Sequence, residues 1–268
     1  MRTILSLLKL LFSHSKAMRS LRSALGKNAL IDSVLIPFRA GDYESALQAA
    51  EAINTADGES HEYCFYRGTI LMYLSRFEES EKWLRKLTAI RQSDNKLSAI
   101  GWSTFGALFL AQRRLDEAME CFRKAYNIWP ERGSADRDIA EVWLCRGDSP
   151  SEALKHATLA VEKDRTRDHG SKEVHDLNLS ENLATLAWAT AVVSHDQEQV
   201  DRLVSEAADL VRGGSVQTVA QVHYHCGQAY AALNNFLKSE QHFEEASRVD
   251  PNGLWGRTAR AARAGAAK

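Results

Sequence analysis

One pattern of large and small residues occurs twice in this chain with the same spacing. Each copy begins with four residues at matching offsets, which are Trp102, Phe105, Gly106 and Phe109, and then His223, Cys226, Gly227 and Tyr230. Each copy continues with five more, which are Leu115, Ala118, Phe122, Ala125 and Pro130, and then Phe236, Ser239, Phe243, Ala246 and Pro251. Large residues three and four apart share one helix face, a central glycine allows a neighbouring helix to approach closely, and proline ends a helix. The pattern therefore predicts packed pairs of helices.

The two copies resemble the tetratricopeptide repeat, whose signature is W-x-x-L-G-x-x-Y, then A-x-x-x-F, then P. The resemblance implies an all-α fold, a right-handed superhelical solenoid of antiparallel helix pairs. It also implies that the first helix of each pair lines a concave surface that binds other proteins.

Weaker copies follow the same frame, and together they predict about six repeats over residues 27–251. The central positions are Val34, Gly68, Gly106, Glu141, Trp188 and Gly227, in steps of 34, 38, 35, 47 and 39 residues. Glu141 and Trp188 replace the small central residue, so we expect irregular packing or a shifted register in repeats four and five. The longest step predicts an inserted surface loop near residues 164–180, because residues 164–173 are polar and contain a glycine.

Composition agrees with an all-α class and offers no catalytic chemistry. The 268 residues are 44% hydrophobic and include only four prolines, which favours long helices. The four cysteines form no C-x-x-C pair, so neither a zinc site nor a disulfide framework is indicated. No phosphate-binding loop, nucleophile elbow or kinase signature occurs. We therefore predict a protein that is not an enzyme and needs no cofactor.

The repeat frame assigns residues to the concave groove. The candidate partner-binding residues are Phe65, Tyr66, Thr69, Ser103, Thr104, Asn182, Gln221, Tyr224, His225 and Gln228. The same projection also places there Ala107, Asp138, Val142, Thr185 and Ala189. Aromatic walls and amide groups suit an extended or helical peptide, although an aromatic residue of a solenoid is more often part of the interhelix core.

Some chaperone-binding relatives clamp a carboxylate with lysines and asparagines, and this chain has none at the matching positions. They are occupied by Ile31, Leu35, Phe65, Thr69 and Ser103. A carboxylate clamp in the groove is therefore not expected.

Two short motifs have structural explanations. His223, His225 and Cys226 could suggest a metal site, but residues two apart on a helix diverge and further ligands are lacking. The segment Arg146-Gly-Asp-Ser-Pro150 matches a cell-adhesion tripeptide, yet it falls where repeat four must turn, and its residues are turn formers.

Both ends of the chain are basic. Residues 1–26 predict an amphipathic helix with a stripe of lysine, arginine and serine beside an apolar face. Its apolar face could be buried at a bilayer surface, on the first repeat as a cap, in the chain's own groove or on a partner subunit, and a cleaved signal peptide is a further alternative. Residues 252–268 predict a basic capping helix or tail.

These features predict a non-catalytic scaffold or adaptor that binds a peptide or amphipathic helix of another protein. The alternative is a membrane-associated assembly or targeting factor anchored by residues 1–25. A homo-oligomer remains open as a partner arrangement, and no nucleic-acid partner is predicted. We expect a cytoplasmic location, with peripheral membrane contact as the alternative.

Overall fold

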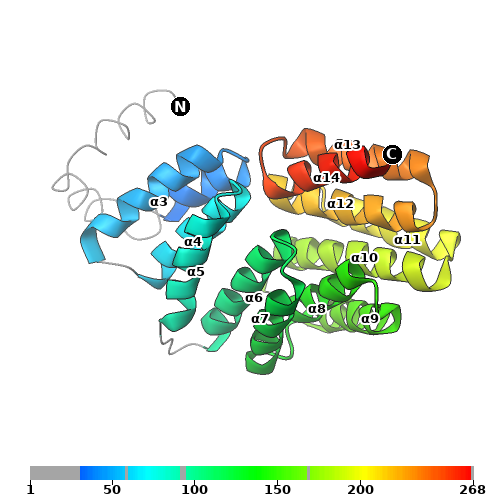
Figure 1. Ribbon diagram of the computed structural model, residues 1–268, viewed down its shortest axis with the longest axis horizontal. Helices are drawn as coiled ribbons and strands as arrows, with labels where there is room; N and C mark the ends of the chain where they lie inside the picture. The colour runs from blue at the N-terminus through cyan, green and yellow to red at the C-terminus, as the bar shows by residue number, and fades with distance from the viewer. Residues whose placement is uncertain (1–30, 58–59, 91–94, 168–169, 267–268) are drawn as a thin grey trace. The chain divides into compact units, whose positions relative to one another are not determined.

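The computed structural model describes residues 31–57, 60–90, 95–167 and 170–266, and it divides the chain into two compact units at Ile90. The described part of unit 1 contains a helix over residues 31–39, α3 (Tyr43–Asp57), α4 (His61–Tyr73) and α5 (Phe77–Ala89). Unit 2 contains α6 (Asn95–Ala111), α7 (Leu115–Ile128), α8 (Gly133–Arg146), α9 (Pro150–Thr166), α10 (Lys172–Ser194), α11 (Gln197–Leu210), α12 (Val216–Ala232), α13 (Phe236–Val249) and α14 (Leu254–Ala266). No strand occurs in the described residues (Figure 1). The predicted all-α class is confirmed.

Consecutive helices pack as pairs, and the six pairs share one frame. The second helix of every pair begins nine residues after the predicted central position, as Leu115 follows Gly106 and Gln197 follows Trp188. In five pairs the residue seven positions after the centre has a positive φ; these residues are Gly41, Ser75, Arg113, His195 and Asn234. A left-handed residue of this kind commonly ends a helix. The predicted register is therefore kept in repeat five.

Repeat four turns one residue earlier than the others. Gly147, six positions after Glu141, ends α8 in the left-handed conformation with φ 74°. Pro150 then begins α9, where its missing N–H would have no intrahelical partner. The segment that matches the adhesion tripeptide is thus a helix–helix turn, as predicted.

Three central glycines allow the two helices of their pairs to approach closely. A Cβ atom at Gly106 would lie 2.5 Å from Phe122 Cε1, and one at Gly227 would lie 2.6 Å from Phe243 Cδ1. At Gly68 the corresponding distance is 2.6 Å to Leu84 Cδ2. Each facing residue is buried, so the glycine marks the point of contact in its repeat.

Gly106→Ala is expected to lower the free energy of unfolding by about 1 to 2 kcal/mol. Overpacking costs about 1 to 3 kcal/mol, and the higher helix propensity of alanine returns up to about 1 kcal/mol. Urea unfolding checks this, and adding Phe122→Leu should recover part of the loss because the two sites couple. A stabilised Gly106→Ala variant would show that the contact is looser than the structure indicates.

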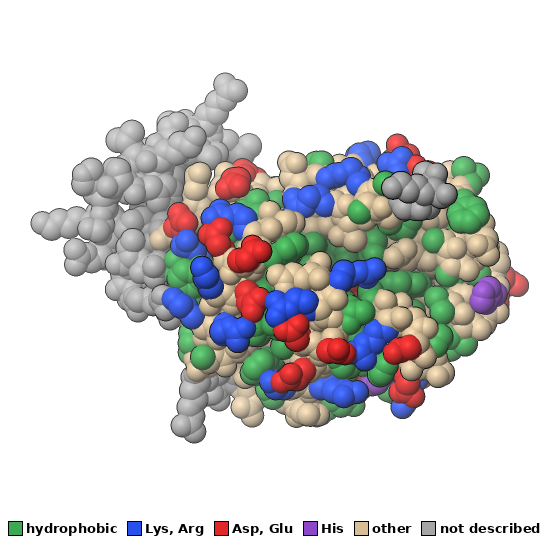
Figure 2. All heavy atoms as spheres, viewed as in Figure 1, with side chains coloured by type: hydrophobic (Ala, Val, Ile, Leu, Met, Phe, Trp, Pro, Cys, Tyr) green, Lys and Arg blue, Asp and Glu red, His purple; other side chains and the backbone are tan. Residues whose placement is uncertain are grey.

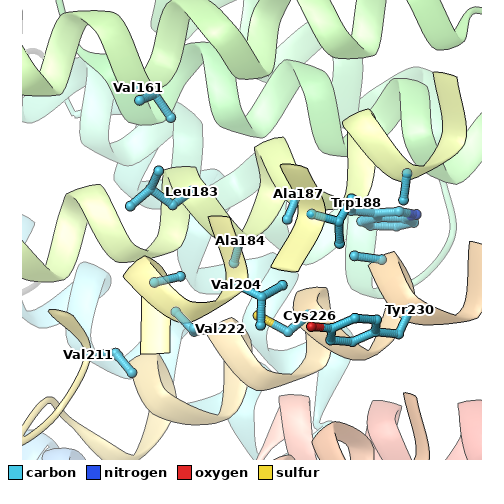
Figure 3. Packing of buried hydrophobic residues seen from close by; sticks show 14 of the residues in the cluster. Val161, Leu183, Ala184, Ala187, Trp188, Val204, Val211, Val222, Cys226 and Tyr230 are labelled. Atoms are coloured by element: carbon cyan, nitrogen blue, oxygen red, sulfur yellow. The ribbon is translucent and has the colours of Figure 1, made fainter. Parts of the chain in front are cut away.

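Repeats four and five make the contact between their two helices with residues of different size. Where the centre is large, the residue sixteen positions later is small: Ala157 after Glu141, and Val204 after Trp188. All four are buried, and Trp188 and Val204 belong to one cluster with Leu183, drawn in Figure 3. The irregularity expected from sequence is thus an exchange of size between the two helices.

The inserted loop predicted near residues 164–180 is wrong for most of that range. Helix α9 continues to Thr166 and α10 begins at Lys172, so only residues 167–171 connect them. The extra length of this repeat lies mainly in α10, which has 23 residues. Ser171 accepts a hydrogen bond from the Val174 amide and caps the start of α10, as serine commonly does.

The two basic ends of the chain differ in what the structure describes. Residues 1–26, predicted to form an amphipathic helix, lie outside the described residues. Near the other end, α14 packs against α12 and α13 (Figure 1). Within the described ranges no helix is both long and apolar enough to cross a membrane. Basic and acidic side chains are interspersed on the face drawn in Figure 2.

Candidate functional site

The predicted groove residues lie on the first helices of their pairs. Phe65, Tyr66 and Thr69 belong to α4 in unit 1, and the others belong to α6, α10 and α12 in unit 2. Two surfaces therefore carry these residues, one on each unit.

The unit 1 surface presents an aromatic pair beside a hydroxyl group. Phe65 and Tyr66 are half-buried, and their rings meet edge to face with centroids 5.4 Å apart. The hydroxyl of Thr69 is buried and has no hydrogen-bond partner among the described residues. We call these three residues the α4 surface. The half-buried aromatic edge suits an apolar part of a ligand.

The α6 residues of unit 2 are partly occupied by other contacts. Ser103 is buried, and its Oγ lies 3.5 Å from Arg132 Nη1. Thr104 is half-buried and donates its hydroxyl to the Ile100 carbonyl at 2.9 Å. Of the two, Thr104 is the more accessible.

Asn182 does not line an open groove, contrary to the prediction. Its side chain is fully buried and its amide donates to Asp164 Oδ2 at 2.7 Å and to the Ala160 carbonyl at 3.1 Å. The amide therefore ties α10 to the last turns of α9, and its role is structural.

His225 and Thr185 are also buried, and the prediction that they line the groove is wrong. His225 Nδ1 lies 3.1 Å from Thr185 Oγ1, and its Nε2 lies 3.2 Å from Glu141 Oε1. The side chains of both predicted residues are fully inaccessible. This hydrogen-bonded chain joins α8, α10 and α12 across 84 residues of sequence. Val142 and Ala189, placed in the groove by the same projection, are fully buried as well.

Tyr224 is covered by the C-terminal helix. Its ring lies 5.4 Å from that of Trp255 on α14 and 5.9 Å from that of Phe243. Burial raises the pKa of the Tyr224 hydroxyl above its ordinary value, and that hydroxyl accepts a hydrogen bond from Gln228 Nε2 at 2.9 Å. Gln221 and Gln228 remain half-buried. Tyr224 is therefore not an open groove residue, and the sequence pattern of the repeats gives no sign of Trp255.

A buried ion cluster was not predicted as a unit. Arg137 of α8 pairs with Asp138 at 2.9 Å and with Glu181 of α10, and each of these side chains is at most 16% exposed. Burial by itself lowers the pKa of Arg137, but the two carboxylates outweigh it and raise the pKa above its ordinary range. The sequence signal was only a charged residue at a groove position, Asp138.

Two cysteines of unit 2 are buried or half-buried, and two histidines of unit 2 are paired with each other. Burial raises the pKa of Cys145 and of Cys226 to about 12, so both are protonated thiols near neutral pH. His223 pairs with His242, with their Nδ1 atoms 3.0 Å apart. No group of three potential metal-binding side chains gathers within the described ranges.

A model of the tetratricopeptide repeat matches residues 101–131 and residues 220–252. The chain carries tetratricopeptide repeats. The two matched segments contain α7 and α13 with the glycine-centred parts of α6 and α12. The prediction of an all-α repeat solenoid is therefore confirmed. Repeats of this family imply a scaffold for protein–protein interaction and are typically non-catalytic.

Solved structures similar to this chain include the following three. BtubC from P. vanneervenii has 16% sequence identity and a TM-score of 0.47, with 82% of this chain and 91% of that chain covered. YrrB, described as a TPR protein with an unusual peptide-binding site, has 18% identity and a TM-score of 0.41, with 81% and 100% covered. PilF of Pseudomonas aeruginosa has 16% identity and a TM-score of 0.49, with 87% and 96% covered. No curated protein matches the sequence.

Proposed function

We propose that this repeat protein is a non-catalytic adaptor that binds a peptide or helical segment of another protein at the α4 surface. The supporting observation is the half-buried pair Phe65 and Tyr66 beside the Thr69 hydroxyl, which lacks a partner among the described residues. Aromatic side chains often carry much of the free energy of protein association. A peptide would bury the aromatic edge of this surface.

Groove residues of unit 2 contribute less to this proposal. Asn182, Tyr224 and His225 are buried and contact other helices of unit 2, so their truncation would destabilise the fold and would not report on binding. The partly accessible polar residues there are Thr104, Gln221 and Gln228.

Phe65→Ala is expected to reduce capture of the partner about tenfold, because truncating an aromatic anchor costs more than 1 kcal/mol of binding free energy. The measurement is affinity capture by the full-length protein with quantitative mass spectrometry, followed by titration of the enriched partner. Phe236→Ala is the matched control, since Phe236 on α13 is 62% exposed and lies outside the α4 surface.

Equal loss in both variants would indicate general surface adhesion and would count against the α4 surface. Unchanged capture by Phe65→Ala would have the same consequence. Turnover of a substrate by the purified protein would contradict the non-catalytic part of the proposal.

The membrane-associated alternative depends on the basic stripe within residues 1–26. Flotation with anionic liposomes tests this alternative. It compares the full-length protein with a double variant that carries Lys9→Glu and Lys16→Glu. Flotation that is lost in the variant favours the alternative, because charge reversal repels anionic lipid. Identical behaviour of both proteins argues against it.

A further inference from the structure

A basic pocket surrounds Trp129 in unit 2, and none of its lining residues is a predicted groove residue. It has a volume of about 660 Å³ and forms where α6 begins and where α7 and α9 end. We call it the Trp129 pocket, and its main lining residues are Lys96, Tyr126, Trp129, Lys163, Thr166 and Arg167. Lys96 lies in the first turn of α6, and the other lining residues lie in the second helices α7 and α9 or directly after them.

Cations gather over the aromatic rings of this pocket. Arg167 Cζ lies 4.6 Å from the ring centroid of Trp129, Lys96 Nζ lies 5.2 Å from it, and Arg132 Cζ lies 5.9 Å from it. Lys163 Nζ lies 5.0 Å from the ring centroid of Tyr126. Cations within about 6 Å of a ring centroid are attracted by the ring, so the rings hold several positive charges close together.

Lys163 and Arg167 differ in how far their charges are compensated by described residues. Lys163 pairs with the buried Asp136 and donates to the Pro130 carbonyl at 2.6 Å. Arg167, by contrast, makes no ion pair with any residue that the structure describes. Among the described lining residues Glu131 is the single carboxylate.

Arg132, which lies beside the pocket and over Trp129, adds to the positive charge there. Burial lowers the pKa of Arg132, and the neighbouring Arg137 and Arg167 lower it further, against the effect of Asp138 and Glu181. An anion bound beside Arg167 would relieve this repulsion.

We propose that the Trp129 pocket binds an acidic peptide segment of a partner protein. A carboxylate reaches both Lys96 and Arg167, which lie over one ring, while the apolar part of the peptide contacts Tyr126 and Pro130. The proposal rests on the proposed protein-binding function and assigns it a second surface with a different chemistry. A nucleotide fits less well, because its base would have to displace the cations that already lie over Trp129.

The test uses full-length protein and two labelled octapeptides. The first alternates glutamate and leucine, and the second replaces each glutamate with glutamine. Fluorescence anisotropy gives the Kd of each for the wild type, for Lys96→Gln with Arg167→Gln, and for a control that removes two other cations, Lys155→Gln with Arg202→Gln. Lys155 and Arg202 are 61% and 65% exposed and lie outside the pocket. Circular dichroism verifies that all variants keep their helices.

We expect the acidic probe to bind the wild type and to weaken about tenfold in the pocket variant, with little change in the control. Binding should also weaken with added salt, since the pocket is open to solvent. Arg167→Lys, which keeps the charge, should retain most of the affinity.

The proposal fails if the glutamine probe binds as tightly, or if the control variant loses as much affinity as the pocket variant. It also fails if ATP binds the pocket and the acidic probe does not. Phe65→Ala separates this proposal from the preceding one, because it leaves the pocket intact. Lost partner capture in that variant, together with no binding of the acidic probe to the wild type, would overturn the pocket alone.

Discussion

Arg137→Leu is expected to lower the free energy of unfolding by about 3 to 5 kcal/mol, because it leaves two poorly solvated carboxylates without their cation. Arg137 is 11% exposed, and its partners Asp138 and Glu181 are 11% and 16% exposed. Urea unfolding of the full-length protein, followed by circular dichroism, measures the change.

The matched control is an exposed ion pair of the same kind. Arg202 pairs with Glu198 at 2.6 Å, with side chains 65% and 85% exposed. Arg202→Leu should change stability by less than about 1 kcal/mol, since water already solvates both charges. Adding Glu181→Leu to Arg137→Leu should recover part of the loss, because an apolar pair can replace a buried ion pair. A loss below about 1 kcal/mol for Arg137→Leu would contradict the burial that the structure assigns to this cluster.

Acid is expected to destabilise the protein through the half-buried histidine pair of α12 and α13, His223 and His242. Burial lowers the pKa of His242 from 6.5 to about 4, with His223 and Lys238 adding to the shift and Glu245 opposing it. The unfolded chain therefore binds a proton that the folded chain does not between these two pH values. Stability from this group is complete above about pH 6.5 and falls as the pH approaches 4.

Between pH 7 and pH 4.5 the wild type should lose about 2 to 3 kcal/mol more than His242→Gln. Carboxylates titrate in both proteins, so the difference isolates the histidine. Urea midpoints at the two pH values measure it, with His195→Gln as an exposed control. Parallel pH dependence of wild type and His242→Gln would show that His242 is not buried as a neutral ring.

The repeats could be predicted from sequence because each one leaves local marks. A glycine at a fixed distance from a large residue is visible in the chain, and Gly106 with Phe122 shows it directly. Even the register of repeat five follows from the fixed distance between Trp188 and the turn at His195.

Whether a groove residue is exposed or covered by another helix could not be predicted in the same way. Tyr224 is covered by Trp255, which lies beyond the last repeat. His225 is hydrogen-bonded to Glu141, which lies 84 residues away in the sequence. No local sequence pattern indicates such a pairing. The loop predicted near residues 164–180 was wrong because a polar segment can extend a helix as readily as interrupt it.

The exchange of size between paired helices restricts how this chain can be altered. Exchanging α6 and α10 alone would place Gly106 opposite Val204 and Trp188 opposite Phe122, giving a void in one repeat and a clash in the other. Exchanging one helix without its partner is therefore unfavourable, although the two contact residues fit each other in each native repeat. The helix pair, and not the single helix, is therefore the smallest part that can be transplanted, and substitutions at its two contact positions should show strong epistasis.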